Sequence, residues 1–414
     1  MPNTIKTNTL TELIAVRFAE AASYLVNGSK KYFAGQLEGK RNGQTYKFVV
    51  RDTGEAVNSL AIGGGDKVSV VEREVSLTLD PWHIGVKTNA IESVTDLNWD
   101  KEIAQPNSQK LVNAVTRKAV QGDLGKCGTA FVGEGFLPLS RASAHLASVT
   151  SEKLYGFIDP NIEAVLTSNG QQFVPVGAPP MYKTGLLGEF HGAEYRAQRF
   201  FEQVNVSADC VTELTGATGA SSSAYTDNSN GTATLKLSFS AASTSFTIPR
   251  GIVIWVEGVY ACDCVGDVTG NLHAFVVLAD VSVASSATTA SVSVRAVDMT
   301  ANSGTREVAK AGGGTIATTD FNSAKIAIPA AGIYFAGIVR AEGAFEFETL
   351  DKLDAEGADY EKGSVNGVTI HKNKLVDLGS MENTTRFDIV SLAGIVEPRA
   401  VSYVLIKYHS LLGS

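Results

Sequence analysis

The segment Leu154–Leu166, LYGFIDPNIEAVL, is the most informative part of this sequence. Residues 154–158 are mostly β-prone and apolar, so they predict a strand. Asp159 and Pro160 then indicate the start of a helix. The carboxylate can accept backbone N–H groups, and the proline stands at the first helical position, where no amide donor is needed. Apolar residues at helical spacing continue to Leu166, so a strand that runs directly into a capped helix is predicted.

Length and composition bound the kind of protein. A chain of 414 residues is too long for one ordinary core, so two or three domains are expected. The net charge of −8, from 35 basic and 43 acidic residues, argues against tight nucleic-acid binding, which needs clustered Lys and Arg. Four cysteines are too few for a disulfide scaffold of this size and suit a reducing compartment.

The N-terminal segment contains no apolar run long enough for a signal peptide. Its longest uninterrupted apolar piece is Leu13–Val16. No segment of the sequence reaches the length of a transmembrane helix. We therefore expect a protein that stays in a cytoplasm or is assembled there into something larger.

The first eighty residues predict a helix followed by a long hairpin. Residues 8–26 have apolar positions at three- and four-residue spacing, and Asn27-Gly28 ends the helix. Two β-prone runs follow, Thr45–Arg51 and Lys67–Leu79, separated by polar and glycine-rich sequence. A projecting hairpin with a polar tip adds little to the stability of a single globular subunit, but it can contact a neighbouring subunit.

The next segment is mainly helical by its periodicity. Residues 88–103 are expected to be helical, and Pro106 interrupts or restarts the chain. Residues 108–121 form the clearest helix, with one apolar face, and residues 141–149 a second, shorter one. Residues 171–180 contain three prolines and are expected to form a strand and then a turn.

From about residue 205 to 322, Ser, Thr, Gly and Ala dominate and charges become rare. Several short strands at this spacing indicate a β-barrel or sandwich inserted as a unit. The expected strands are Thr232–Phe239, Phe246–Ile248, Ile252–Tyr260, Ala274–Val283 and Ser291–Val297. After residue 323 the chain returns to mixed character, with strands expected at Phe345–Glu348 and within Phe387–Lys407.

Two glycine-rich segments superficially resemble nucleotide-binding loops. Gly63–Lys67 lacks the spacing and the Ser or Thr after Lys that would hold phosphate and magnesium, so a flexible hairpin tip is favoured. The segment Gly185–Gly192 does not have the GxGxxG pattern of a dinucleotide site. No cofactor is predicted.

Cys262 and Cys264 are candidates for a metal site, because they are two residues apart on a predicted strand and so face one side together. With His273 they could form part of such a site. Zinc normally takes four ligands at recognisable spacing, and Cys127 and Cys210 offer no second pair. Small buried side chains are therefore favoured over a metal site.

Two charged clusters also have simple explanations. A run of acidic residues between positions 351 and 361 could bind a divalent cation, but it departs from the calcium-loop pattern, so a solvated loop is favoured. It comprises Asp351, Asp354, Glu356, Asp359 and Glu361. The basic cluster of Lys30, Lys31, Lys40 and Arg41 is small, so ion pairs with an acidic neighbour are favoured over nucleic-acid binding.

No catalytic centre is predicted. The six histidines are scattered without HxH or HExxH spacing, and there is no GxSxG elbow. They are His83, His145, His191, His273, His371 and His409. The chain is therefore not expected to be an enzyme.

The order of these elements resembles that of the major capsid (coat) proteins of tailed bacteriophages, which have the Hong Kong 97-like fold. The likeness is greatest to the branch of short-tailed enterobacterial phages whose coat protein carries an inserted β domain. The matching segments are SKKYFAGQ at 29–36 with the hairpin to 79, SLTLDPWHIGVKTNAIES at 76–93, the helix at 108–121, LYGFIDPNIEAVL at 154–166, GLLGEFHGAEYRAQRFFEQV at 185–204, FTIPRGIVIWVEGV at 246–259 and RFDIVSLAGIVEPRAVSYVLI at 386–406.

The resemblance implies an α+β architecture in six parts. They are an N-terminal arm (1–30), an extended hairpin loop (31–76), a peripheral domain with a long spine helix (77–153), the first part of an axial domain (154–204), an inserted β-barrel-like domain (205–325) and a return to the axial and peripheral domains (326–414).

The resemblance also implies a structural function. Copies would assemble as hexamers and pentamers into an icosahedral shell around double-stranded DNA, first in the host cytoplasm and then as part of the virion. The implied partners are a scaffolding protein and a portal protein, with a decoration protein as an optional further one. Contact with packaged DNA would be weak and non-specific, and no membrane is involved. The sequence gives no support for the lysine–asparagine crosslink that some members use.

Two other classes of protein compete with this interpretation. An encapsulin-type cellular nanocompartment shares this fold and is the alternative function. A secreted β-rich adhesin would fit residues 205–325, but not the lack of a signal peptide.

Overall fold

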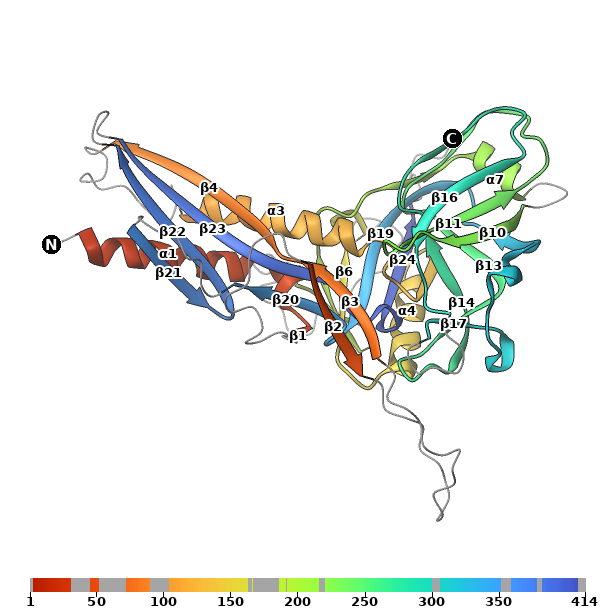
Figure 1. Cartoon of the computed structure of the whole chain (residues 1–414), viewed down its shortest axis with the longest axis horizontal. Helices are drawn as coiled ribbons and strands as arrows, with labels where there is room; N and C mark the ends of the chain where they lie inside the picture. The colour runs from red at the N-terminus through yellow and green to blue at the C-terminus, as the bar shows by residue number, and fades with distance from the viewer. Residues whose placement is uncertain are drawn as a thin grey trace, which may run out of the picture.

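The computed structural model describes residues 3–30, 45–51, 72–89, 104–162, 166, 186–190, 192–215, 220–299, 306–350, 359–377 and 382–408. These residues form a mixed α+β chain that is elongated (Figure 1). A long peripheral sheet with its helices lies at one end, a central sheet lies in the middle, and the β-rich part from residue 220 to 327 lies at the other end.

The peripheral sheet is built around its longest strand, β23. One side of β23 pairs with β4, and the other pairs first with β22 and then with β20, because β23 is long enough to span both. Strand β21 adds to β22, and β1 runs parallel to β20. The bounds are β1 Ser29–Lys30, β4 Asp80–Asn89, β20 Phe345–Thr349, β21 Asp359–Val365, β22 Val368–Asp377 and β23 Glu382–Ile395.

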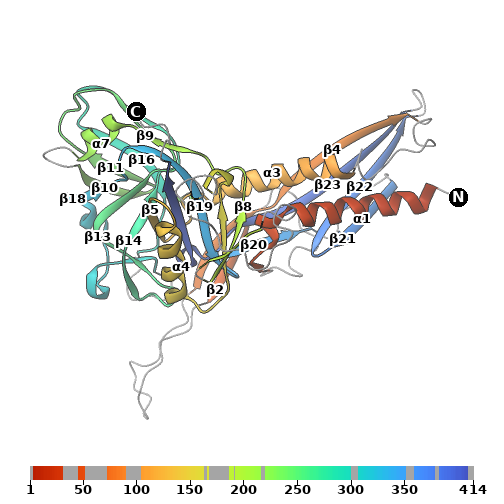
Figure 2. The ribbon, with the colours of Figure 1, turned by 180° about the vertical axis from the view of Figure 1, so that it is seen from behind.

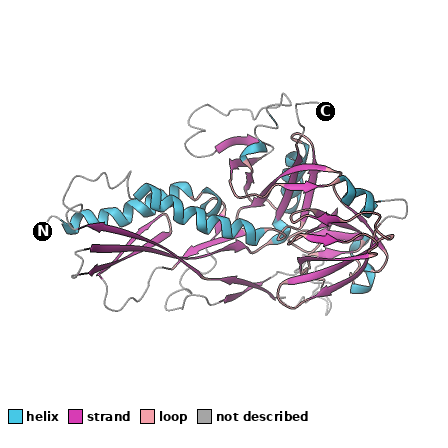
Figure 3. Cartoon of the chain, turned by 90° about the horizontal axis from the view of Figure 1, so that it is seen from above, coloured by secondary structure: helices cyan, strands magenta, loops and turns pink. Residues whose placement is uncertain are grey.

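Helices α1 (Asn3–Ala21) and α3 (Gln105–Asp123) lie side by side over one face of this sheet (Figure 3). The apolar stripe of α3 is buried as its periodicity predicts. Helix α1 approaches β21 so closely that a Cβ at Gly363 would lie 2.7 Å from the backbone nitrogen of Glu12. Glycine at this position therefore allows the helix to rest on the sheet.

The helix expected at 8–26 is present, but it is interrupted at Ala22, after which α2 (Ser23–Val26) begins. Pro106 lies in the first turn of α3 and does not interrupt it, since the first turn needs no amide donor there. The helix expected at 141–149 lies within α4 (Leu137–Val149). Of the helix expected at 88–103, Thr88 and Asn89 are instead the end of β4, and residues 90–103 lie outside the described residues.

The central sheet contains β6, the strand predicted at 154–158. The order of this sheet is β5, β24, β19, β6, β8 and β7, with β9 also pairing with β19. Beyond β6, the Asp159 carboxylate accepts the N–H of Asn161 at 2.8 Å and Pro160 is helical, so the predicted strand and cap are confirmed. The bounds are β5 Thr129–Gly133, β6 Leu154–Ile158, β7 Leu186–Phe190, β8 Ala193–Ala197, β9 Val204–Val206, β19 Gly332–Ala341 and β24 Val401–Lys407.

Strands β10 to β18 pair only with one another in the described part of the chain. The larger sheet has the order β14, β13, β18, β10, β11 and β16, and β17 pairs with β13. The N–H of Leu278, just beyond β14, donates to the carbonyl of Ser293 in β16 at 2.9 Å, so the sheet curls towards a barrel. The bounds are β10 Ser221–Asp227, β11 Thr232–Ser238, β12 Phe246–Ile248, β13 Val253–Cys262, β14 Val268–Val276, β15 Val281–Val283, β16 Thr289–Arg295, β17 Val308–Ala309 and β18 Ala324–Ala327.

Several details of this β-rich part differ from the expectation. The single strand expected at Ala274–Val283 is split into β14 and β15, because β15 leaves the larger sheet and pairs with β12. The two strands in the segment 246–259, β12 and β13, therefore belong to different sheets. Short helices also occur: α7 (Ala208–Thr215), with η2 (Ala311–Gly313) and η3 (Thr318–Phe321) later in the chain and η4 (Pro398–Ala400) just before β24.

The predicted hairpin is present as an antiparallel ribbon of β2 (Thr45–Arg51) and β3 (Glu72–Thr78). Its second strand ends at Thr78, one residue before the expected Leu79, and residues 67–71 of the expected strand lie outside the described residues. The tip, residues 52–71, lies outside the described residues. The base of the ribbon is anchored in a small apolar cluster that contains Leu77, Leu79 and Val390.

We predict that residues 207–329 fold in isolation, whereas 206–322 do not. Val206 pairs with Gly332, so the chain leaves and re-enters the central sheet at adjacent points. The shorter fragment lacks β18, which pairs with both β13 and β10 and so joins the two halves of the sheet. Thermal melts and amide NMR spectra of both fragments test this. A cooperative melt of the 206–322 fragment, or the lack of a cooperative melt for the 207–329 fragment, would show that this domain boundary is wrong.

Candidate functional site

The largest fully buried side chain of the described residues belongs to Arg340 in β19. Its Nη2 donates to the backbone carbonyl of Tyr24 and, at 3.0 Å, to that of Asn27. Both carbonyls lie where α2 ends and the chain turns into β1. Because an unpaired buried carbonyl is costly, this guanidinium fixes the end of the N-terminal helical segment to the centre of the sheet.

Three aromatic rings surround the same guanidinium. Its carbon lies 3.8 Å from the ring centroid of Phe345, 4.6 Å from that of Phe157 and 4.7 Å from that of Tyr24. Nε and Nη1 of Arg340 have no hydrogen-bond partner, so their N–H groups face the aromatic rings instead. Attraction between a cation and ring faces is strongest where water is excluded, as it is here.

Tyr24 extends this cluster to α3. Its hydroxyl donates to Oδ2 of Asp123 at 2.8 Å, and Oδ1 of Asp123 accepts the N–H of Ile395 at 2.9 Å. Asp123 is the last residue of α3, and Ile395 is the last residue of β23. One chain of contacts therefore joins α2, α3, β19 and β23. We call Tyr24, Asp123, Phe157, Arg340 and Phe345 the arm latch.

Burial governs the ionisation of the arm latch. It lowers the pKa of Arg340 to about 10, which still leaves the guanidinium charged at neutral pH. Burial raises the pKa of the Asp123 carboxyl, against the opposing effect of nearby Lys126. Arginine keeps its charge in such places better than lysine, and its planar group can stack on rings. The cluster presents no exposed nucleophile, so its role is to hold elements together.

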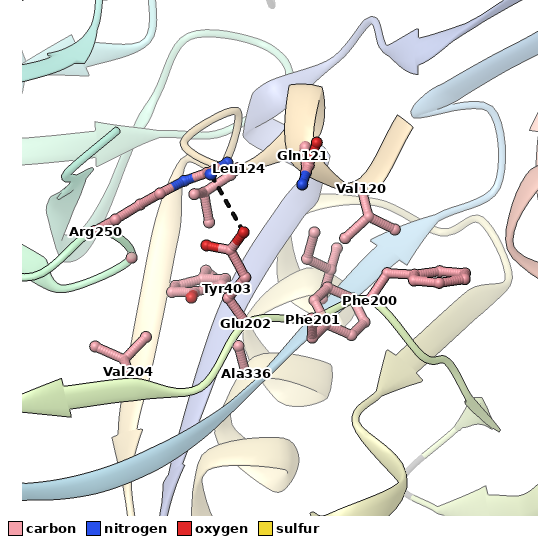
Figure 4. Close-up of a pocket in the computed structure, with 12 residues that line it drawn as sticks. Val120, Gln121, Leu124, Phe200, Phe201, Glu202, Val204, Arg250, Ala336 and Tyr403 are labelled. Carbon is pink, nitrogen blue, oxygen red and sulfur yellow. Dashed lines mark hydrogen bonds and ion pairs between the residues drawn. The ribbon is translucent and has the colours of Figure 1, made fainter. Parts of the chain in front are cut away.

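A second contact region joins the β-rich part to the central sheet (Figure 4). Arg250 pairs with Glu202 at 3.2 Å, and a Cβ at Gly251 would lie 2.9 Å from the side chain of Val204. The cavity beside them, also lined by Leu124, measures about 20 Å³. That is room for about one water molecule, so it is a packing gap and not a ligand site.

Two histidines lie near this junction, and both are neutral. Asn271 of β14 donates to Nδ1 of His145 in α4 at 3.1 Å, and burial lowers the pKa of His145 to about 4. Burial also lowers the pKa of His273 to about 3, and its ring packs edge-on against Phe275 at 4.8 Å.

The proposed cysteine pair is not on one strand face. Cys262 is the last residue of β13, and Cys264 lies in the turn that follows, so the assumption behind a shared metal site was wrong. His273 instead packs in the core. Within the described residues, no group of three or more His, Cys, Asp or Glu side chains could hold a metal ion.

The other sequence candidates have structural roles where they can be seen. Residues 186–190 are β7, which forms a hairpin with β8 and precedes no helix. Lys30 lies 4.0 Å from Glu152, the kind of ion pair expected for its cluster. Glu361 of the acidic run pairs with Lys372 at 2.8 Å. Gly63–Lys67, Lys31, Lys40, Arg41 and residues 351–358 lie outside the described residues.

The remaining histidines are equally dispersed. His371 in β22 is buried, and its Nε2 lies 2.8 Å from the carbonyl of Leu350. His83 is in the edge strand β4, and His191 and His409 lie outside the described residues. None of the sequence motifs indicated the arm latch. Its one visible signal was Arg340, a lone charge at the end of the otherwise apolar run GIYFAGIVRA.

No helix among the described residues is both long and apolar enough to cross a membrane. No protein-family model matches this sequence, and no curated protein matches it either.

Several solved structures are similar over most of their length, at low identity. The head structure of Helicobacter pylori bacteriophage KHP40 is 7% identical with a TM-score of 0.43, covering 94% of this chain and 89% of that one. The capsid of Ralstonia phage GP4 is 7% identical with a TM-score of 0.42, covering 93% of each. A virus-like particle from Pyrococcus furiosus is 8% identical with a TM-score of 0.40, covering 96% and 97%. These scores are too low to assign a function.

We predict that Arg340→Lys lowers the free energy of unfolding by about 2 kcal/mol, because an ammonium cannot stack on three rings and reach both carbonyls. It should also speed protease cleavage within residues 3–30. Urea unfolding and timed proteolysis measure both effects. Arg386→Lys, at a half-exposed side chain, is the control and should change stability by less than about 0.5 kcal/mol. Equal behaviour of the two variants would disprove the role of the arm latch.

We predict that His145 makes the fold acid-sensitive. A folded pKa of about 4 against an unfolded value of about 6.5 means that its contribution is complete above pH 6.5 and is lost towards pH 4. The stability advantage of the wild type over His145→Gln should therefore shrink by up to about 3 kcal/mol across this range. His273 is present in both proteins, so its effect on stability cancels in the difference. A difference that stays constant with pH would contradict the prediction.

Proposed function

We propose that this protein is the major capsid protein of a tailed bacteriophage, with the Hong Kong 97-like fold and an inserted β domain. The observation that carries the proposal is the shape of the subunit. An elongated sheet with two helices extends far from the central sheet, and the N-terminal helix α1 runs along it (Figures 1 and 2). An elongated subunit of this kind has a long perimeter, which suits contacts with several neighbours.

The domain assignment is part of the proposal. The arm corresponds to α1 and α2, the extended loop to the β2–β3 ribbon, and the peripheral domain to α3 with the sheet around β23. The axial domain corresponds to the central sheet, and the inserted domain to β10–β18. The arm latch supports this assignment, because it fixes the arm and the spine helix to the central sheet in a single geometry.

The partners follow from this function. Copies form hexamers and pentamers of an icosahedral shell around double-stranded DNA, with a scaffolding protein and a portal protein during assembly in the host cytoplasm. A decoration protein is an optional further partner. The subunit acts in the virion as a structural protein without a catalytic site.

We predict that the purified protein, mixed with its scaffolding protein at rising concentration, forms closed shells because its extensions need neighbours. Light scattering and negative-stain microscopy measure this. A species that remains monomeric under all conditions would contradict the proposal. Shells that form without scaffolding protein and enclose a cellular enzyme would favour the encapsulin alternative.

We predict that excising residues 52–71, with β2 and β3 joined by a short turn, leaves a folded subunit that forms no stable shells. The excised sequence holds four glycines and equal numbers of polar and apolar residues, and the base of the ribbon keeps its apolar cluster. A deletion of residues 36–65 would also remove β2, so the excision of 52–71 is the sharper test. Circular dichroism and melting of the variant serve as the folding control. Loss of the melting transition would show that this segment belongs to the core.

A further inference from the structure

A polar pocket lies where the N-terminal segment meets α3 and the turn after β8. Its volume is about 260 Å³. Five of its eleven lining residues carry a side-chain amide or hydroxyl group, and its only carboxylate among the described residues is that of Glu20. The lining includes Ser23, Gln109, Asn113, Thr116 and Gln198. Hydrogen-bond donors therefore predominate over negative charge.

One of these groups is buried and unused. Thr116 is 2% exposed, and its Oγ1 has no hydrogen-bond partner. A helical threonine commonly donates to a carbonyl in the preceding turn, and this one does not. An acceptor oxygen that entered the pocket would satisfy this hydroxyl.

Three exposed cations either line the pocket or directly follow a residue that lines it. Lys110 and Arg117 lie two turns apart on α3, about 10 Å along its axis. Arg199 lines the pocket itself, and the adjacent Phe200 packs under the Arg117 guanidinium at 5.2 Å. We call Lys110, Arg117 and Arg199 the α3 cation surface.

The nearby carboxylates do not neutralise this surface. Glu20 pairs with Arg17 at 3.0 Å, Asp80 with Lys118 at 2.6 Å, and Glu202 with Arg250 at 3.2 Å. None of the three cations of the α3 cation surface forms an ion pair with a described residue. In a chain whose net charge is −8, this leaves a local concentration of positive charge.

We propose that the α3 cation surface and the adjoining pocket bind backbone phosphates of double-stranded DNA without sequence preference. This rests on the proposed function, since it identifies where the shell protein touches its packaged DNA. Guanidinium groups and hydroxyls are the usual phosphate partners, and they carry no base information. The surface is small, so the contact is weak and depends on salt.

Duplex DNA suits the surface better than an acidic peptide. Two of the three cations, Lys110 and Arg117, lie about 10 Å apart on one helix, and a duplex presents about one charge per 1.7 Å of its axis, so several phosphates meet a stripe of this length. An acidic peptide would need its carboxylates at matching positions. A DNA duplex carries phosphates along its whole length, so it can meet the cations at any position along its axis.

The test measures binding of a fluorescent 30-base-pair duplex to the unassembled protein by anisotropy, from low to physiological salt. The variant Lys110→Gln/Arg117→Gln/Arg199→Gln should weaken binding at least tenfold at low salt and reduce the salt slope by about 1 for each phosphate that is no longer neutralised. Thr116→Val should weaken binding by a smaller factor, because it removes only the hydroxyl in the pocket.

The matched control is Arg141→Gln/Lys236→Gln/Lys325→Gln, which removes three exposed cations from other elements. An equal weakening of binding in the two triple variants would overturn the proposal, as would binding of polyglutamate in preference to the duplex. Shell formation by each variant is scored separately by microscopy. Failure to form shells would count against the proposed function, whereas an unchanged salt slope counts against the DNA surface alone.

Discussion

A charged group in the middle of an apolar core constrains most of this structure. The Arg340 guanidinium is excluded from water, so its cost of burial must be offset by carbonyls and ring faces in fixed positions. The chain supplies these from α2, β6 and β20, and Tyr24 carries the connection on to Asp123 at the end of α3. These elements come from distant parts of the sequence. None can shift without leaving the guanidinium unsatisfied.

This arrangement matters for a protein that we propose to be a shell subunit. The peripheral sheet is elongated, so its direction relative to the central sheet depends on the contacts that hold the end where the two sheets meet. The arm latch provides these contacts, and Gly363 lets α1 rest against the sheet along its length. On the opposite side, the Arg250–Glu202 pair and the His145–Asn271 hydrogen bond join the β-rich part to the central elements. The subunit therefore presents its extensions to neighbours in one geometry.

The charges of the chain are distributed unevenly, which reconciles an acidic protein with a proposed role around DNA. Most carboxylates near α3 are paired with cations, while Lys110, Arg117 and Arg199 form no ion pair with a described residue. A subunit with a negative net charge and a weakly basic surface at α3 would enclose a duplex without binding it tightly. Local charge, not the sum over the chain, governs such a contact.

Elements whose signals are local could be predicted from the sequence. Asp159 and Pro160 predicted the end of β6 and the helix start, and β-prone runs predicted the ribbon and most strands of the β-rich part. Strand pairing and burial could not be predicted in this way and are seen in the folded chain. It placed β12 with β15, split the run at 274–283, and put β18 between β13 and β10. It also assembled the arm latch from residues far apart in the sequence, such as Tyr24 and Phe345, because such contacts depend on how sheets pack and not on any pattern along the chain.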